Sequence, residues 1–156
     1  MTRRTPAHGQ HGFTLLELVM VMLIIGVLAA VAAPRWSLTD ATVHAQAAQI
    51  ARDLRHVQML AMSQGRTLTF QSLGGGYRCV DAASTVITDP AAQRPFNVTL
   101  SDGVTLSAGS VSFDSLGRPV SGGNPSAGTT AYTVAGAAQS ADVTVSPVTG
   151  FVVVNP

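Results

Sequence analysis

The stretch of sequence that decides the fold is residues 12–34, which read GFTLLELVMVMLIIGVLAAVAAP. From Phe13 to Ala33 there are 21 residues, and Glu17 is the only charged one among them. A helix of that length measures about 31 Å at 1.5 Å per residue, which matches a bilayer core of about 30 Å. A carboxylate is costly inside such a segment, so its presence predicts a function. We therefore expect a transmembrane helix over residues 13–36 with one functional acid near its start.

The first seven residues of this stretch, Gly12 to Leu18, resemble the processing motif of type IV prepilins. In that family an inner-membrane prepilin peptidase cuts after the glycine and N-methylates the phenylalanine that becomes the new N-terminus. The resemblance implies a leader over residues 1–12, cleavage between Gly12 and Phe13, and methylation of Phe13. It also implies that Glu17 is the assembly carboxylate and that the partners are other pilin or pseudopilin subunits.

Glu17 allows two roles. Cleavage after Gly12 frees the amine of Phe13, which is largely cationic at neutral pH, and the carboxylate of one subunit can meet that amine on its neighbour. Such a pair would neutralise both charges within lipid and set the axial register of a filament. The alternative is local: Glu17 pairs with the amine of its own chain or favours the positive end of the helix dipole. The resemblance favours the first role, and the residues alone leave both open.

The N-terminal region also has features of an ordinary secretory signal. Arg3 and Arg4 precede an apolar core, and Ala30 to Ala32 offer a small-residue cleavage site. Cleavage there would release a soluble periplasmic binding domain or enzyme that begins near Ala33. The apolar run is longer than the usual signal core of about 7–15 residues, and Glu17 lies inside it. Both features favour the prepilin interpretation.

The arginines around the apolar segment predict its orientation. Arg3 and Arg4 place the N-terminus in the cytoplasm by the positive-inside rule, although Arg35 at the other end is a weaker opposing signal. We therefore expect a single-pass subunit that contacts inner-membrane lipid through this segment. Residues 37–156 then form one periplasmic domain, which later enters a filament or tip complex.

The exported part of the chain is nearly neutral. Beyond Trp36 there are six arginines and seven aspartates, and residues 119–156 contain no basic residue. Contacts with phosphate groups require basic side chains. DNA is therefore not an expected partner, and the alternative of a DNA-uptake minor pilin is disfavoured.

Residues 40–64 carry the pattern of an amphipathic helix. Their apolar side chains recur at steps of four, three and four, on one stripe of a 3.6-residue helix: Ile50, Leu54, Val57 and Ala61. Gly65 follows as a typical helix stop. We expect this helix to continue the membrane helix and to pack its stripe on a sheet.

Beyond that helix the apolar period falls to two, and residues 66–156 predict a series of short strands. Gly74–Gly76 and Asp102-Gly103 are typical of hairpin turns, and Pro147–Gly150 of a longer turn. Residues 117–130 are rich in Gly, Ser and Pro and predict a mobile loop. Strands are expected around residues 67–71, 77–80, 86–87, 96–100, 104–106, 111–113, 132–134, 143–145 and 151–154.

Three stretches of the strand region, residues 111–118, 142–145 and 149–152, resemble the minor-pilin group typified by FimT and the H-type pseudopilin of type II secretion. Residues 51–55 and 61–63 of the helix are similar to the same group. The resemblance implies an α+β, pilin-like fold with a long N-terminal helix packed on an antiparallel β-sheet domain. It implies a structural subunit of a type II secretion pseudopilus or a type IV pilus, with a mannose-sensitive-haemagglutinin-type pilin as the remaining option.

The sequence offers no candidate catalytic or metal-binding residues and implies no cofactor. His44 and His56 lie twelve residues apart on the predicted helix, and Gly74–Gly76 lacks the Lys-Ser/Thr of a phosphate-binding loop. Asp114 precedes Gly117 in a stretch typical of a turn rather than of a calcium site. We therefore expect a structural protein and not an enzyme.

Cys79 is the only cysteine, so an intramolecular disulfide is impossible, although the periplasm permits disulfides. A buried and inert thiol is the expected state. Reactivity, or pairing with a second chain, is the alternative.

Overall fold

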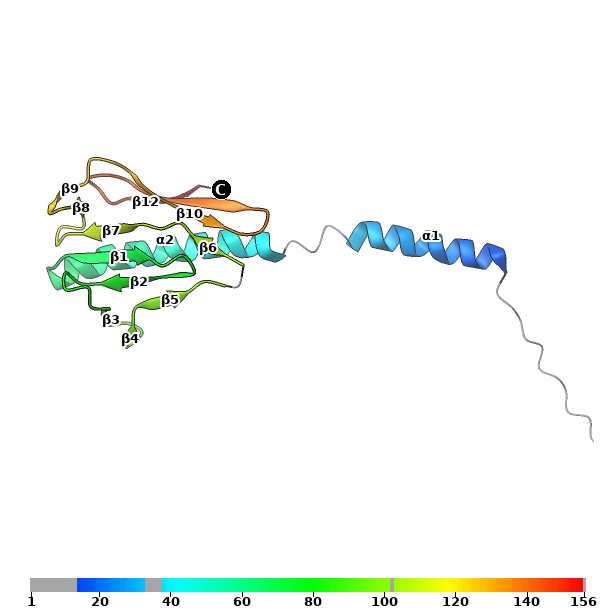
Figure 1. The fold of residues 1–156 in the computed structure, drawn as a ribbon, viewed down its shortest axis with the longest axis horizontal. Coiled ribbons are helices and arrows are strands. Elements are labelled where there is room, and N and C mark those ends of the chain that lie inside the picture. The colour runs from blue at the N-terminus through cyan, green and yellow to red at the C-terminus, as the bar shows by residue number, and fades with distance from the viewer. Residues whose placement is uncertain (1–13, 33–37, 102, 156) are drawn as a thin grey trace, which may run out of the picture. The chain divides into compact units, whose positions relative to one another are not determined.

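The computed structural model describes residues 14–32, 38–101 and 103–155. The chain divides into two compact units, residues 1–37 and 38–156. In the first unit the described structure is helix α1, Leu15–Ala32 (Figure 1). The membrane helix predicted over residues 13–36 extends beyond α1 at both ends, into residues outside the described part. Within the described residues, no helix has the combination of length and apolar character that crossing a membrane requires.

Helix α1 is apolar around its circumference. Its large apolar side chains from Leu15 to Leu28 are exposed, and even the least exposed of them, Val21, has 47% of its surface accessible. A helix that is hydrophobic on all sides requires surroundings that are also apolar. The exposed surface of α1 therefore requires an apolar partner that α1 itself does not supply.

The second unit begins with helix α2, Leu38–Gln64, which has the predicted amphipathic pattern. The four side chains of the predicted stripe, from Ile50 to Ala61, are fully buried. Polar and charged side chains such as Arg52 lie on the exposed side. The predicted single long helix is described as two helical segments, because residues 33–37 between α1 and α2 lie outside the described part.

The end of α2 is closed by a glycine, as predicted. Gly65 has a φ of +62°, a conformation that glycine adopts without a steric penalty. Its N–H donates to the carbonyl of Met62 at 3.3 Å, and the N–H of Arg66 donates to the carbonyl of Ala61 at 3.2 Å. These two bonds satisfy carbonyl groups that a helix C-terminus leaves open, and they turn the chain into the first strand.

The strands form two main sheets and one small hairpin, all with antiparallel neighbours (Figure 1). The six-stranded sheet has the order β5-β2-β1-β7-β8-β9, with bounds β1 Leu68–Ser72, β2 Gly76–Val80, β5 Asn97–Thr99, β7 Ser110–Phe113, β8 Pro119–Ser121 and β9 Asn124–Pro125. The four-stranded sheet has the order β12-β11-β10-β6, with bounds β6 Thr105–Leu106, β10 Thr130–Ala135, β11 Ser140–Val145 and β12 Val152–Asn155. The hairpin pairs β3 Thr88–Asp89 with β4 Arg94–Pro95.

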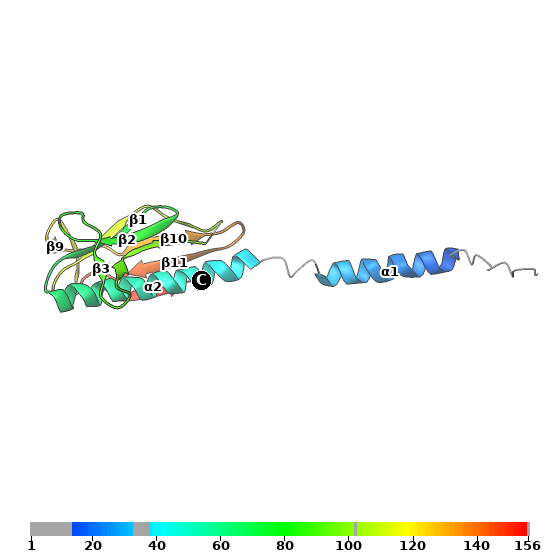
Figure 2. The same cartoon turned by 90° about the horizontal axis from the view of Figure 1, so that it is seen from below.

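Helix α2 lies along one side of the strands and contacts both main sheets (Figure 2). Phe70 of β1 stacks on Tyr77 of β2 with ring centroids 4.9 Å apart, and meets Tyr132 of β10 edge-on at 5.4 Å. All three rings are fully buried. Phe70 therefore joins the two sheets beneath α2. The predicted packing of a helix on antiparallel strands is confirmed, so the fold is α+β and pilin-like.

Two details of the strand region differ from the prediction. Asp102 of the predicted Asp102-Gly103 hairpin lies outside the described residues, and the strands on either side, β5 and β6, belong to different sheets and do not pair as a hairpin. Residues 117–130, predicted as a mobile loop, contain β8 and β9, which pair through Val120 and Pro125. Strands of two or three residues are too short to show alternation in sequence, which explains both errors. The hairpins predicted at Gly74–Gly76 and Pro147–Gly150 join β1 to β2 and β11 to β12, as expected.

Candidate functional site

Of the three predicted site residues, the structure describes one. Gly12 and Phe13 lie outside the described residues. Glu17 occupies the first turn of α1 and is exposed. The hydroxyl Oγ1 of Thr14, directly before the helix, accepts a hydrogen bond from the N–H of Glu17 at 3.2 Å. The motif thus has two local functions, since its threonine caps the helix and its acid lies at the positive end of the helix dipole.

The carboxylate of Glu17 makes no hydrogen bond or ion pair with any other described residue. The sequence Thr14 to Glu17 has the spacing of a capping box, in which an N-cap hydroxyl receives the N–H of the third helical residue. The backbone of Glu17 takes part in that cap, whereas its side-chain oxygens stay available. The geometry is compatible with the local role and leaves an acceptor for a second chain.

A polar cavity of about 180 Å³ lies between α2 and the β3–β4 hairpin. Its polar lining includes Gln49, Asp53, His56, Asp89 and Arg94. No Ser, Thr or Cys lines it, so the cavity lacks a hydroxyl or thiol nucleophile. Among the described residues, no group of three or more His, Cys, Asp or Glu side chains is placed to hold a metal ion.

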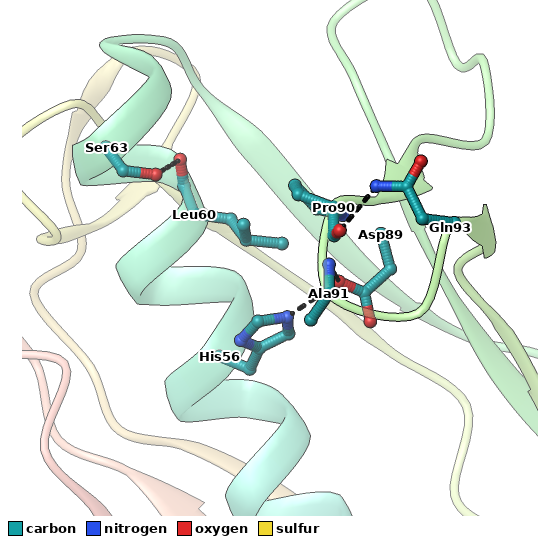
Figure 3. A network of polar contacts seen from close by, with 7 residues as sticks. All are labelled: His56, Leu60, Ser63, Asp89, Pro90, Ala91 and Gln93. Atoms are coloured by element: carbon teal, nitrogen blue, oxygen red, sulfur yellow. Dashed lines mark hydrogen bonds and ion pairs between the residues drawn. The ribbon is translucent and has the colours of Figure 1, made fainter.

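His56 of α2 and Asp89 of β3 form a polar contact that the sequence did not predict (Figure 3). His56 Nε2 lies 3.1 Å from Asp89 Oδ1, and the same oxygen accepts the N–H of Ala91 at 2.9 Å. Partial burial raises the pKa of Asp89, but the hydrogen bonds from Ala91 and His56 outweigh it, so the pKa lies below its usual value. The His56 ring also stacks on Phe96, with centroids 5.9 Å apart. This network holds the hairpin on the helix.

Asp53 and Tyr77 form a second link between α2 and the six-stranded sheet. The Tyr77 hydroxyl donates to Asp53 Oδ2 at 2.5 Å. Burial raises the pKa of Asp53, and the tyrosine hydrogen bond only partly opposes that effect. Burial and the neighbouring carboxylate raise the pKa of Tyr77 as well. The pair therefore has the character of a structural hydrogen bond between a helix and a strand.

The remaining candidates are structural. Cys79 is fully buried, as expected, and burial raises the pKa of its thiol to about 12. Asp114 is a turn residue: its Oδ1 accepts the N–H groups of Leu116 and Arg118, each at 2.9 Å, and its Oδ2 accepts the guanidinium of Arg118 at 2.8 Å. Because an arginine occupies that carboxylate, the turn interpretation is favoured over calcium binding.

Comparison with known proteins agrees with this geometry. Residues 7–33 match the prokaryotic N-terminal methylation motif, which implies membrane anchoring. The fold is shared with the type IV minor pilin FimU of Pseudomonas aeruginosa, with a TM-score of 0.55 and 16% identity over 73% of this chain and 88% of that chain. A second crystal form of FimU gives a TM-score of 0.53 and 14% identity over 72% and 92%. Among curated proteins, none matches the chain.

Motif and fold together define a pilin-type subunit. Residues 46–150, which comprise most of α2 and the strands up to β11, match the family described as type II transport protein GspH. The chain belongs to this family, and it is a minor pilin or pseudopilin subunit. The resemblance deduced from the sequence is thereby confirmed, whereas the roles of Gly12, Phe13 and Glu17 remain predictions.

Proposed function

We propose that the chain is a minor structural subunit of a periplasmic filament, in a type II secretion pseudopilus or a type IV pilus. Prepilin peptidase cuts it between Gly12 and Phe13 and N-methylates Phe13. Residues 13–36 anchor it in the inner membrane with the N-terminus in the cytoplasm, and residues 37–156 fold in the periplasm. Its function is to assemble with other subunits, which requires no cofactor and no catalytic residue.

One observation carries this proposal: the single carboxylate of the otherwise apolar helix α1, that of Glu17, lies in its first turn and within the processing motif, and it has no side-chain partner among the described residues. Cleavage after Gly12 creates a cationic amine on Phe13 that the precursor does not have. In an apolar filament core that amine requires an anion, and the Glu17 carboxylate of a neighbouring subunit can supply it. N-methylation keeps the positive charge, so it preserves the pairing.

The energetics favour such pairing strongly enough to control assembly. Breaking a buried ion pair by removing one partner leaves an uncompensated charge and costs about 3–5 kcal/mol. The same removal costs an exposed precursor little, since Glu17 has no side-chain partner among the described residues. An effect that appears only on assembly is therefore the signature of the intermolecular role.

We expect Glu17→Ala to reduce incorporation into filaments sharply while leaving membrane abundance, cleavage and the fold of residues 38–156 unchanged. Substitution removes the partner of a neighbour's amine but leaves the scissile bond and the β domain intact. The measurement is the amount of the variant in sheared filament fractions, with crosslinking to neighbouring subunits. Met22→Ala, a truncation of another exposed α1 side chain, is the matched control. Undiminished incorporation of Glu17→Ala would leave only the local capping role.

A further inference from the structure

Exposed apolar side chains of the second unit gather at one end of it. Six large apolar side chains of this unit are exposed among the described residues: Met59, Met62, Leu73, Leu116, Val148 and Phe151. Five of these belong to three segments that meet at the C-terminal end of α2, namely the last turns of α2, the β7–β8 turn and the β11–β12 turn. Leu73 lies elsewhere, in the β1–β2 turn at the far end of β1 (Figure 1).

The contacts between these three segments are direct. Gln58 of α2 donates from Nε2 to the carbonyl of Gly117 at 2.7 Å and to that of Thr149 at 3.1 Å, so one side chain binds both turns. A Cβ atom on Gly117 would lie 2.8 Å from the sulfur of Met62, which shows how closely the β7–β8 turn approaches the helix. We call the surface formed by Met59, Met62, Leu116, Val148 and Phe151 the α2-end patch.

Two features of the α2-end patch are not explained by folding. Val148 has a φ of +67°, a region that β-branched residues rarely adopt, and yet its side chain is 59% exposed. Phe151 is 64% exposed, although it directly precedes the buried Val152 of β12. A strained backbone that presents an apolar side chain to solvent indicates a function for that side chain.

The basic side chains Arg118 and Arg55 at the margin of the α2-end patch already have partners within the domain. The Arg118 guanidinium pairs with Asp114 at 2.8 Å, and Arg55 donates to the carbonyl of Val152 at 2.8 Å. An anionic lipid surface or a nucleic acid would require free basic groups. The patch is therefore suited to an apolar protein surface.

The area of the α2-end patch is suited to a weak interface that a second attachment between the same two partners strengthens. Side chains that are 45–67% exposed together present on the order of 500 Å² of apolar surface, within the range of about 300–600 Å² of patches that are often functional. Buried on two partners, it would give about 1,000 Å², the lower limit for a specific interface. Such a contact is weak between free molecules and becomes effective when a second attachment holds the partners together.

We propose that the α2-end patch binds the globular domain of a different pilin-type subunit in the same filament. The proposal rests on the proposed function, because membrane anchoring and assembly supply the second attachment. A second copy of this chain is a poorer occupant: joining patch to patch gives a closed pair, which cannot extend a filament. The partner's contribution would be an uncharged, apolar surface.

Site-specific photocrosslinking in cells that make the full-length chain and its filament tests the proposal. A benzophenone amino acid replaces Met59 or Phe151 in the patch, and Leu73, which is 51% exposed, is the matched control position. We expect both patch positions to crosslink to a protein that carries its own prepilin processing motif, identified by mass spectrometry, with a yield about tenfold above that from Leu73.

Every other outcome counts against the α2-end patch. Crosslinks to a second copy, to lipid alone, or equally from Leu73 would overturn the proposal. If the chain is present in filaments but the patch crosslinks to nothing, the patch proposal fails and the proposed function stands. If the chain is absent from filaments altogether, both fail. A second arm compares Met62→Ser combined with Phe151→Ser against Leu73→Ser, and only the double variant is expected to lose incorporation.

Discussion

Tyr77 and Tyr132 are the two largest fully buried side chains of the core, and they differ in what their hydroxyls contact. The Tyr77 hydroxyl donates to Asp53 on α2. The Tyr132 hydroxyl is buried and has no hydrogen-bond partner among the described residues. A buried polar group without a partner costs about 1–3 kcal/mol, so the two phenols contribute to stability with opposite signs.

Replacing each tyrosine by phenylalanine separates these contributions. We expect Tyr132→Phe to leave the free energy of unfolding unchanged or to raise it by up to about 1 kcal/mol, because it removes only an unpaired hydroxyl. We expect Tyr77→Phe to lower it by about 1–3 kcal/mol, because Asp53 then loses its donor. Chemical denaturation of the purified full-length chain in detergent measures both. Equal destabilisation by the two substitutions would contradict the assignment.

At the residue scale, sequence reasoning succeeded where a pattern is local and failed where a contact is distant. The burial of Cys79 and the turn at Asp114 follow from their immediate neighbours. The contact of His56 with Asp89 spans 33 positions, and only the folded chain brings the two together. Spacing along a helix shows partners one turn away and no others. Asp53 lies three positions before His56 on α2 and was within reach of that reasoning, whereas Asp89 was not.

Between elements, the polar contact of His56 with Asp89 joins the β3–β4 hairpin to α2, which makes this attachment sensitive to acid. The pKa of Asp89 lies below its ordinary value, because the hydrogen bonds from Ala91 and His56 outweigh the effect of burial. A depressed pKa contributes stability above the unfolded value of about 3.9, and that stability is lost as the pH falls through the folded value. Asp53 has the opposite sign, since burial raises its pKa.

The pH dependence of unfolding distinguishes these two carboxylates. We expect the free energy of unfolding of the full-length chain to fall less between pH 7 and pH 3 in Asp89→Asn than in the wild type. We expect it to fall more in Asp53→Asn, because that substitution removes a group that the folded state prefers to keep protonated. Denaturation curves at the two pH values provide the measurement. Identical pH dependence in both variants would show that the hydrogen bonds do not control the titration.

At the scale of elements, the sequence predicted α2 and the long hairpins, and it did not predict the division into two sheets. A 27-residue helix repeats its apolar period many times, so the stripe that ends at Ala61 is unmistakable. The β5–β6 connection changes sheet within a few residues, and a turn motif such as Asp102-Gly103 carries no information about which strands it joins. Sheet membership is decided by packing against α2 and by pairs such as Phe70 and Tyr132.

For the whole molecule, one apolar helix with a single acid precedes a GspH-type domain whose exposed apolar side chains gather at one end. Neither feature is explained by the stability of an isolated chain, because α1 and the α2-end patch both expose apolar surface. The proposed assembly would explain both, because neighbouring subunits would cover those surfaces. In the proposed function, assembly in turn depends on processing, since the amine that would pair with Glu17 would exist only after cleavage at Gly12.

The most direct test of this account is the N-terminus of the mature chain. Intact-mass and N-terminal peptide analysis of the protein from the membrane fraction should find a chain that begins at Phe13 and carries one methyl group on its amine. A chain that begins near Ala33, as cleavage of an ordinary secretory signal would leave, or one that still begins at Met1, would contradict it.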